Sequence, residues 1–579
     1  MSKRFARLCV LVSLLGICGA GCATQEEWDR FWTSFEDPGQ QPDPLLALPS
    51  NSRALAGTIG QSVTIGGLNL TQVRGYGLVV GLADSGGSDG PEVVKQYLVK
   101  EIRRNQRVGG PGTPASDLIE SRDTAMVEVT GYMPAGAQKG DRFDVVVRAL
   151  GSQTKSLSGG RLDLCSLKLF AESPQGIIEG KDLATASGPV FVSPFNRAGR
   201  ATSKVDLRIG FVLGAGVVKE PREVRLVLND PRYSLARQIM NRINSRHGGV
   251  EPLADAKNAS TIAIEIPDEW KDRKRVYLQR ILHTTVQGSE DFLLRRARDL
   301  SDEIEHPDAA LDSIGLAWEG IGTIAMSIIS EHYLDEDPAA RFYAARTGLR
   351  LGDVDGMKIV AKAALDPLSP FRRQGIDELG FARNMHGAAL ALSKVLSDED
   401  SDVRILAYQS LRRQPSSAID SRVLDSDNLI LDVIDSGGPF LIYVQRLNEP
   451  RIALFGRQMR CQPPAQFPGQ RRDERFLHLL ATAAPDNDHL TLIYKNKFSD
   501  LTSPPIEAPL DVGPLVRLLG DRFDLDDDGE PTGLAVPYSE IVDLLETFCS
   551  SRTIPARFVA EEREEPDEED ERSRPESEY

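Results

Sequence analysis

The stretch R-G-Y-G-L-V-V-G-L-A-D-S-G-G runs from Arg74 to Gly87. Its centre, Leu78 to Leu82, is an apolar run of strand-forming residues, and it ends in a small acidic turn. Gly75, Gly77 and Gly81 precede or interrupt this run. A dinucleotide-binding fingerprint instead places its glycines after a strand, where a helix begins, so that backbone amides face the pyrophosphate. The order found here favours a structural strand with close backbone approach over a nucleotide-binding site.

The residues around this stretch predict an α+β domain over residues 58–287. Helical spacing of apolar residues predicts helices at Pro91–Arg104 and Ser234–Arg246. Alternation and β-branched residues predict strands at Met126–Thr130, Phe143–Ala149, Leu162–Phe170, Lys204–Phe211, Glu223–Leu228 and Thr261–Ile266. The second helix carries Arg232, Arg237, Arg242 and Arg246. Because the chain has a formal net charge of −17, we expect no nucleic-acid partner, and interpret these arginines as a solvated face or a contact with an acidic neighbouring subunit.

Five blocks, in this order, resemble the flagellar P-ring protein family of bacterial basal bodies. They are Arg74–Gly87, Arg122–Val147, Leu150–Leu162, Gly214–Pro221 and Leu226–Asn244. The resemblance ends near Val286 and covers about two fifths of the chain; the family's own C-terminal part is not recognisable beyond it. It implies a structural, non-enzymatic subunit that forms a homo-oligomeric ring around the flagellar rod, next to the rod and L-ring proteins. The alternative is a lipid-anchored envelope scaffold that is not flagellar and binds a protein partner.

The start of the chain has the pattern of a bacterial lipoprotein signal over residues 1–21. A basic beginning is followed by the apolar run Leu8–Ile17, which is too short to span a membrane, and by Gly19-Ala20-Gly21-Cys22. We predict lipidation of Cys22, which would anchor the chain in the periplasm, with outer-membrane attachment favoured by Ala23. A plain secretory signal remains the alternative. Residues 22–57 are predicted to be a linker.

The cysteines do not form a disulfide framework. Beyond Cys22, the mature chain has Cys165, Cys461 and Cys549, an odd number. Cys165 lies in an alternating strand pattern and is predicted to be buried. A Cys461–Cys549 pair is possible, but free thiols are favoured.

Residues 291–427 are predicted to be an all-α domain with weak internal repeats. Arg341, Arg372 and Arg404 are spaced by 31 and 32 residues, and each follows an acidic helix start. This resembles HEAT-type helical repeats, which stack on their neighbours and present an elongated face to partners. A plain helical bundle is the alternative. The aromatic residues of this region, at helical spacing, are interpreted as core rather than as a cofactor site: Trp318, Tyr333, Phe342 and Tyr343.

Residues 428–560 are predicted to be a small α+β domain, followed by a disordered acidic tail over 561–579. The segments Phe440–Arg446 and Arg451–Phe455 predict a hairpin. Leu490–Lys495 predicts a further strand, and Ser539–Phe548 predicts a helix.

An acidic loop in this domain is a candidate calcium site. Asp524, Asp526, Asp528 and Gly529 have the spacing that opens a calcium-binding loop. The position where such a loop needs a closing glutamate is Ala535. We therefore favour a solvated acidic turn and expect no cofactor.

Catalytic patterns are weak throughout the chain. Its seven histidines show no helical metal-binding spacing, and no nucleophile elbow, phosphate loop or CxxC pair is present. Asp141 stands at a strand start and is interpreted as a turn residue with a cross-strand salt bridge. The sequence predicts a structural protein and not an enzyme.

Overall fold

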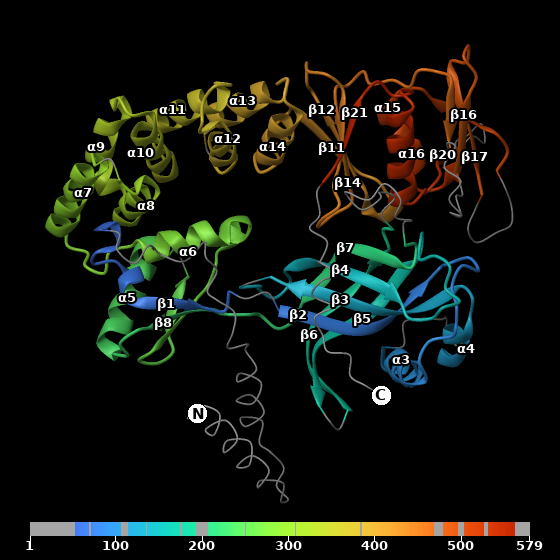
Figure 1. The fold of residues 1–579 in the computed structure, drawn as a ribbon, viewed down its shortest axis with the longest axis horizontal. Coiled ribbons are helices and arrows are strands. Elements are labelled where there is room, and N and C mark those ends of the chain that lie inside the picture. Colours follow the sequence, from blue (N-terminus) through green and yellow to red (C-terminus); the bar gives the residue numbers. More distant parts are fainter. Residues whose placement is uncertain are drawn as a thin grey trace, which may run out of the picture. The chain divides into compact units, whose positions relative to one another are not determined.

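The computed structural model describes most of the chain after residue 52 (Figure 1). It covers residues 53–68, 71–105, 114–134, 136–173, 176–192, 206–248, 251–306, 308–382, 385–467, 479–495, 503–525 and 531–561. The predicted signal, Cys22 and the acidic tail after Glu561 lie outside these residues. In the described part, no single helix is long and apolar enough to cross a membrane; one pair of segments, bent by 114°, meets the length and composition test only when taken together.

A closed six-stranded barrel forms the centre of the N-terminal region (Figure 1). Its strands, in spatial order, are β2 (Thr71–Val80), β3 (Thr124–Met133), β4 (Arg142–Ala149), β7 (Ile209–Val218), β6 (Gly176–Pro189) and β5 (Arg161–Ser173), and β5 pairs back with β2. All neighbours are antiparallel. Alternate side chains fill the interior, as period-two strands require. Helices α3 (Glu92–Asn105) and α4 (Ala115–Glu120) bury Leu98 and Ile119 against the outside of the barrel.

The glycines of the opening stretch are needed inside one chain. Gly75 and Gly77 lie within β2 and face β5, and a Cβ atom on Gly75 would stand 2.3 Å from the carbonyl oxygen of Ser166. These residues therefore belong to the strand itself and not to the start of a helix, which confirms the structural interpretation. The strand predicted at Lys204–Phe211 is instead β7, Ile209–Val218, so that prediction ended too early. Gly216 of this strand makes room for a neighbouring ring, because a Cβ there would stand 2.6 Å from Phe143.

A second, four-stranded sheet has the order β1-β8-β10-β9. Its strands are β1 (Val63–Gly66), β8 (Val224–Leu228), β10 (Thr261–Ile264) and β9 (Ala254–Ala256). They are accompanied by α5 (Tyr233–His247), the 3-10 helix η3 (Asp268–Arg273) and α6 (Lys274–Leu282). The two helices predicted in this region, α3 and α5, are confirmed to within one residue at each end.

The described chain begins within the predicted linker 22–57. The 3-10 helices η1 (Arg53–Leu55) and η2 (Ile59–Gln61) begin the described chain. Ala54 is fully buried in the core of the helical region. Its burial depends on residues that are distant in the sequence, so no local sequence pattern predicts it. The earlier linker residues lie outside the described part.

The middle of the chain is helical, as predicted. It contains α7 (Glu290–Ile304), α8 (Leu311–Ile321), η4 (Thr323–Ala325), α9 (Met326–Ile329), η5 (Ser330–Leu334), α10 (Pro338–Leu351), α11 (Val354–Leu365), α12 (Arg372–Gly380), α13 (His386–Val395) and α14 (Ser401–Leu411). One continuous apolar core runs through them. Trp318 is buried in this core and donates its indole N–H to the carbonyl oxygen of Ala297 at 3.1 Å. The aromatic residues of this region pack in or against the core.

The helical turns repeat in detail at the spacing found in the sequence. Asp335, Asp366 and Asp398 each accept a hydrogen bond from the amide two residues later, at 2.9–3.0 Å. The arginine six residues after each aspartate turns back to a carbonyl oxygen before its own helix. Arg372 also pairs with Asp398, the aspartate of the following turn. The repeated carboxylate and guanidinium therefore hold each turn through local hydrogen bonds, and Arg372 links its turn to the next one.

Two sheets enclose two helices in the C-terminal region (Figure 1). The first sheet is β11 (Ile419–Val423), β12 (Ile430–Ile434), β14 (Arg451–Phe455), β13 (Leu441–Val444) and β21 (Arg557–Ala560), and the second is β15 (Ala465–Phe467), β16 (Leu479–Ala483), β17 (His489–Tyr494) and β18 (Ile506–Pro509). Helices α15 (Val512–Gly520) and α16 (Tyr538–Ser550) share one apolar core with both sheets. The predicted hairpin is β13–β14, and the predicted strand and helix are β17 and α16. The first sheet starts at Ile419, before Asn428, where the sequence predicts the change to strands.

The three described cysteines are free thiols, so the possible Cys461–Cys549 pair is not formed. Cys165 is buried in β5, as predicted. Burial raises the pKa of each of these thiols to about 12, which leaves them protonated and unreactive at neutral pH.

Candidate functional site

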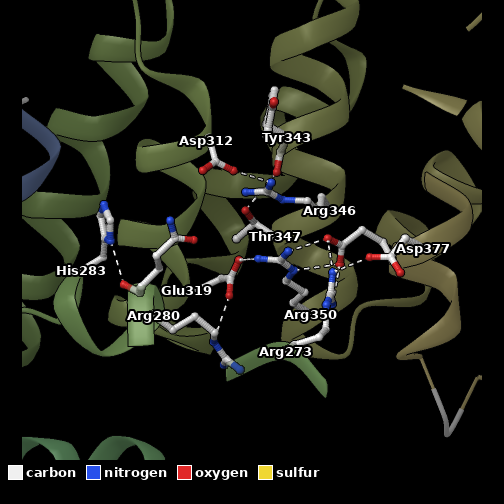
Figure 2. Close-up of polar contacts among 12 residues, drawn as sticks. Arg273, Arg280, His283, Asp312, Glu319, Tyr343, Arg346, Thr347, Arg350 and Asp377 are labelled. Carbon is white, nitrogen blue, oxygen red and sulfur yellow. Dashed lines mark hydrogen bonds and ion pairs between the residues drawn. The ribbon is translucent and has the colours of Figure 1, made fainter. Parts of the chain in front are cut away.

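A cluster of buried charged residues lies where α6 meets the helical region (Figure 2). Two glutamates form its centre: Glu319 of α8 is fully buried, and Glu378 of α12 is 3% exposed. Arg350 of α10 lies between them and donates to Glu319 Oε1 and to Glu378 Oε2, both at 2.9 Å. Arg350 therefore ties three helices of the middle region together through buried charge-assisted bonds.

Two arginines from the N-terminal region complete the site. Arg273, at the end of η3, binds both carboxylate oxygens of Glu378, at 2.7 and 3.1 Å. Arg280 of α6 places its Nε 3.0 Å from Glu319 Oε2. The contact of Arg280 with Glu319 is an ion pair only, because neither the Nε nor the Oε2 atom has a hydrogen-bond partner among the described residues. Glu319 and Glu378 thus share Arg350 of the helical region. Each also pairs with one arginine of the N-terminal region, in α6 or in η3 before it.

The charges of this site are fixed by mutual contact. Burial alone would raise the pKa of Glu378, but Arg350 and Arg273 outweigh it and hold that pKa well below its ordinary value. Burial would lower the pKa of Arg350, and the two glutamates raise it instead. Removing one member of such a buried network leaves an uncompensated charge, which commonly costs about 3–5 kcal/mol.

A fourth arginine, Arg246, caps the end of α8. Arg246 of α5 donates to the carbonyl oxygens of Glu319, at 2.7 Å, and Gly320, at 3.3 Å. Carbonyls in the last turn of a helix lack intrahelical partners and attract cations. Arg242 donates to the carbonyl oxygen of Thr285, in the segment after α6, at 3.0 Å. The interpretation of the α5 arginines as a solvated face is therefore wrong for these two, whereas Arg237 is exposed.

His247 is surrounded by the same cations. Its Nε2 lies 2.8 Å from the hydroxyl of Thr284. Burial, and then Arg280, Arg246 and Arg242, lower its pKa to about 3. The imidazole is therefore neutral in the folded chain at any pH near neutrality.

A second junction joins the barrel to the C-terminal sheet. Asp144 of β4 accepts from the amide of Gly214 at 2.7 Å and from the amide of Asn448, in the β13–β14 turn, at 3.0 Å. Gly214 has φ +56°, and a Cβ there would stand 2.2 Å from the carbonyl oxygen of Asn448. A cleft of about 560 Å³ lies beside this contact, with Arg142, Arg161, Glu449 and the buried aromatic Tyr538 in its walls.

The sequence-predicted site residues are not brought into one site. Cys22, Asp526 and Asp528 lie outside the described residues, and Asp524 lies in the short strand β19 (Asp524–Leu525), paired with β20 (Pro531–Gly533). Within the described residues, no group of three or more His, Cys, Asp or Glu could hold a metal ion.

Asp141 does form salt bridges, but not across strands. Its carboxylate lies 2.9 Å from Lys271 and 3.5 Å from Lys274, which come from η3 and α6. The predicted cross-strand salt bridge is therefore wrong in its partner, because both lysines lie in helical segments. Burial raises the Asp141 pKa, and hydrogen bonds from the Gln138 amide and from Lys271 lower it further than burial raises it.

The two glycine-rich segments meet each other inside one chain. Asp89, after the first segment, accepts from the amide of Ser152 at 2.6 Å and from the amide of Gln153 at about 3 Å. A Cβ on Gly160 would stand 2.5 Å from Val79. These segments close the barrel, so their glycines serve folding.

Sequence reasoning missed the charged junction. Glu319 stands within the apolar run L-A-W-E-G-I, and a carboxylate in such a run needs a buried partner. That signal was available. The identity of the partners was not, because Arg280 and Arg350 are 39 and 31 positions away in the chain.

The fold and these contacts describe a β-barrel module that is joined at two junctions to a helical region and a mixed α/β region. Residues 58–292 match the family described as flagellar P-ring protein, a structural and non-enzymatic component of the basal body. The chain is similar to the flagellar P-ring proteins of Aquifex aeolicus (31% identity over 36% of this chain and 56% of the relative), Geobacter metallireducens (31%, 40% and 60%) and Nitratidesulfovibrio vulgaris (28%, 39% and 60%). The chain thus spans about three fifths of the length of these curated relatives.

Proposed function

We propose that this protein is a P-ring-like subunit of the bacterial flagellar basal body, which forms a homo-oligomeric collar around the rod. The match of residues 58–292 to the P-ring family carries this proposal. Each subunit would offer one surface to a different surface of its neighbour, a heterologous contact that closes into a ring. The rod and L-ring proteins are the partners expected in that place.

The helical region, residues 291–427, is proposed to act as a HEAT-like partner-binding arm of this subunit. The repeated Asp–Arg turns support this assignment, since stacked helical repeats present continuous faces to other proteins. The buried charges at α6 couple this arm to the ring module. The mixed domain, proposed to span 428–560, is coupled through Asp144.

We further propose that Cys22 is lipidated and holds the protein in the periplasm at the outer membrane. The sequence before Cys22 supports this assignment. Replacing Cys22 by Ser should release the protein from membranes into the soluble periplasmic fraction. Unchanged membrane retention, or a mature N-terminus without acyl mass, would count against lipidation.

Electron microscopy of purified basal bodies, with this chain labelled, tests the ring proposal. We expect label at the collar position around the rod. Label spread over the envelope, in cells that assemble normal flagella without this protein, would instead favour the alternative of a lipid-anchored scaffold.

A further inference from the structure

An apolar groove lies between α11 and α13 in the helical region. It has a volume of about 550 Å³. Its apolar lining consists of Met357, Ala361, Leu365, Gly387, Leu390 and Ala391. Leu390 is 61% exposed and Leu365 is 39% exposed. Large exposed leucines that converge on one groove indicate a binding surface rather than scattered surface residues.

The rim of this groove is basic, in a chain with a net charge of −17. Lys358, Lys362 and Lys394 line it, together with Asp366. Lys358 is paired with Asp355 at 2.7 Å. Lys362 and Lys394 have no ion-pair partner in the described part of the chain. The groove therefore fits a ligand with large apolar side chains and acidic flanks.

This chain contains a sequence with that chemistry. T-Q-E-E-W-D-R-F-W-T-S-F-E-D runs from Thr24 to Asp37. Its large aromatic residues are Trp28, Phe31, Trp32 and Phe35. The spacing i, i+3, i+4, i+7 is that of one face of a helix and of helices that bind in grooves. Around them stand five acidic residues and one arginine, and Thr24 with Glu27 has the capping-box pattern of a helix start.

We propose that the α11–α13 groove binds the Thr24–Asp37 sequence of a second copy of this chain, as an amphipathic helix. The aromatic face would cover Leu365 and Leu390, and the acidic residues would neutralise Lys362 and Lys394. From Trp28 to Phe35 a helix rises about 10 Å, which fits within the length of α13, about 15 Å for its ten residues.

Other occupants fit less well. The acidic residues after Glu561 include no Leu, Ile, Val, Phe or Trp to fill the groove. An anionic membrane surface prefers helices with a basic polar face, which this sequence lacks. The sequence from Pro38 to Pro49 contains four prolines, a composition typical of spacers, which favours presentation to a neighbouring copy over return to the same chain. The choice of a neighbouring copy rests on the proposed oligomer, whereas binding to the groove does not.

Fluorescence anisotropy with a labelled synthetic Thr24–Asp37 peptide tests the groove. The receptor is the mature full chain with Cys22→Ser, which cannot be acylated, and with Phe31→Ala and Trp32→Ala, which disable its own segment. We expect Leu390→Glu in this receptor to weaken binding by at least about tenfold. Leu368→Glu is the matched control, because Leu368 is 91% exposed and does not line the groove; it should bind the peptide unchanged. Absence of binding, or equal loss in both variants, would overturn the proposal.

The same peptide distinguishes a neighbouring copy from the same chain. A chain with its own segment intact, diluted until monomeric, should bind the peptide as well as the receptor with the disabled segment. If the intact segment blocks the groove in the monomer, it binds its own chain and the proposal of a second copy is wrong. Neither measurement requires rings, so a failure here is separate from a failure to find rings in basal bodies.

Discussion

His247 is a half-buried imidazole beside three arginines, and its lowered pKa makes stability depend on pH. The unfolded chain binds a proton at this residue below about pH 6.5, whereas the folded chain binds it only near pH 3. The stabilising contribution is therefore complete above pH 6.5 and falls as the pH drops toward 3. We expect a loss of about 2 kcal/mol between pH 8 and pH 5 from this residue.

Urea unfolding at pH 8 and pH 5 measures this loss. His247→Gln keeps a donor for the Thr284 hydroxyl but cannot be protonated, so its free energy of unfolding should fall by about 2 kcal/mol less than that of the natural chain. His306→Gln, on an exposed residue, should leave the pH dependence unchanged. Equal pH dependence in all three proteins would show that His247 is not held neutral by its neighbours.

Glu378 forms ion pairs with two arginines. Glu378→Gln keeps the shape of the side chain but leaves Arg273 and Arg350 short of one negative charge in a buried site. We expect the free energy of unfolding to fall by about 3–5 kcal/mol, measured by chemical denaturation at neutral pH. The exposed Glu399→Gln should change it by less than about 0.5 kcal/mol.

The acidic turn at Asp524 is expected not to bind calcium. Ala535 stands where a closing carboxylate is needed. Thermal unfolding should therefore be the same with calcium and with chelator. A rise in Tm with calcium that Asp526→Ala abolishes would establish a site, since a ligand that binds the folded state stabilises it.

At the scale of elements, the turn between β13 and β14 is held to β4 by one carboxylate. Asp144→Ala removes the acceptor for the amides of Gly214 and Asn448. We expect faster hydrogen–deuterium exchange at both amides, with the rest of β13–β14 unchanged because its ladder stays intact. Asp182→Ala, on β6, is the control and should leave both amides protected.

Local elements followed from the sequence because their signals are local. Alternation identified β3, β4 and β5, and the acidic helix starts identified the repeated turns of the middle region. The pairing of β5 with β2 to close the barrel was not predictable, since it joins residues about 90 positions apart. The charged junction was missed for the same reason: each arginine looks like an ordinary surface residue until its distant glutamate is known.

At the scale of the whole molecule, the region that matches the P-ring family depends on residues outside the match. Arg246, Arg273 and Arg280 all find their partners in Glu319 or Glu378. A fragment ending at Gly288 leaves these three cations without those partners. We expect α5 and α6 to lose protection from hydrogen exchange in the fragment, while the barrel strands keep theirs through their own core.

The full chain is the reference for this measurement, and protection of α5 and α6 should be high there. Equal protection in the fragment would mean that the family region folds independently of the helical arm.

Closure of the barrel has a consequence for solubility at high local concentration. Each strand from β2 to β7 has a hydrogen-bonded neighbour on both sides, so the barrel offers no open edge for another chain to extend. Proteins that crowd against the barrel can therefore contact it through side chains and turns but cannot extend it by strand pairing, whereas the four-stranded sheet has β1 and β9 as its edge strands.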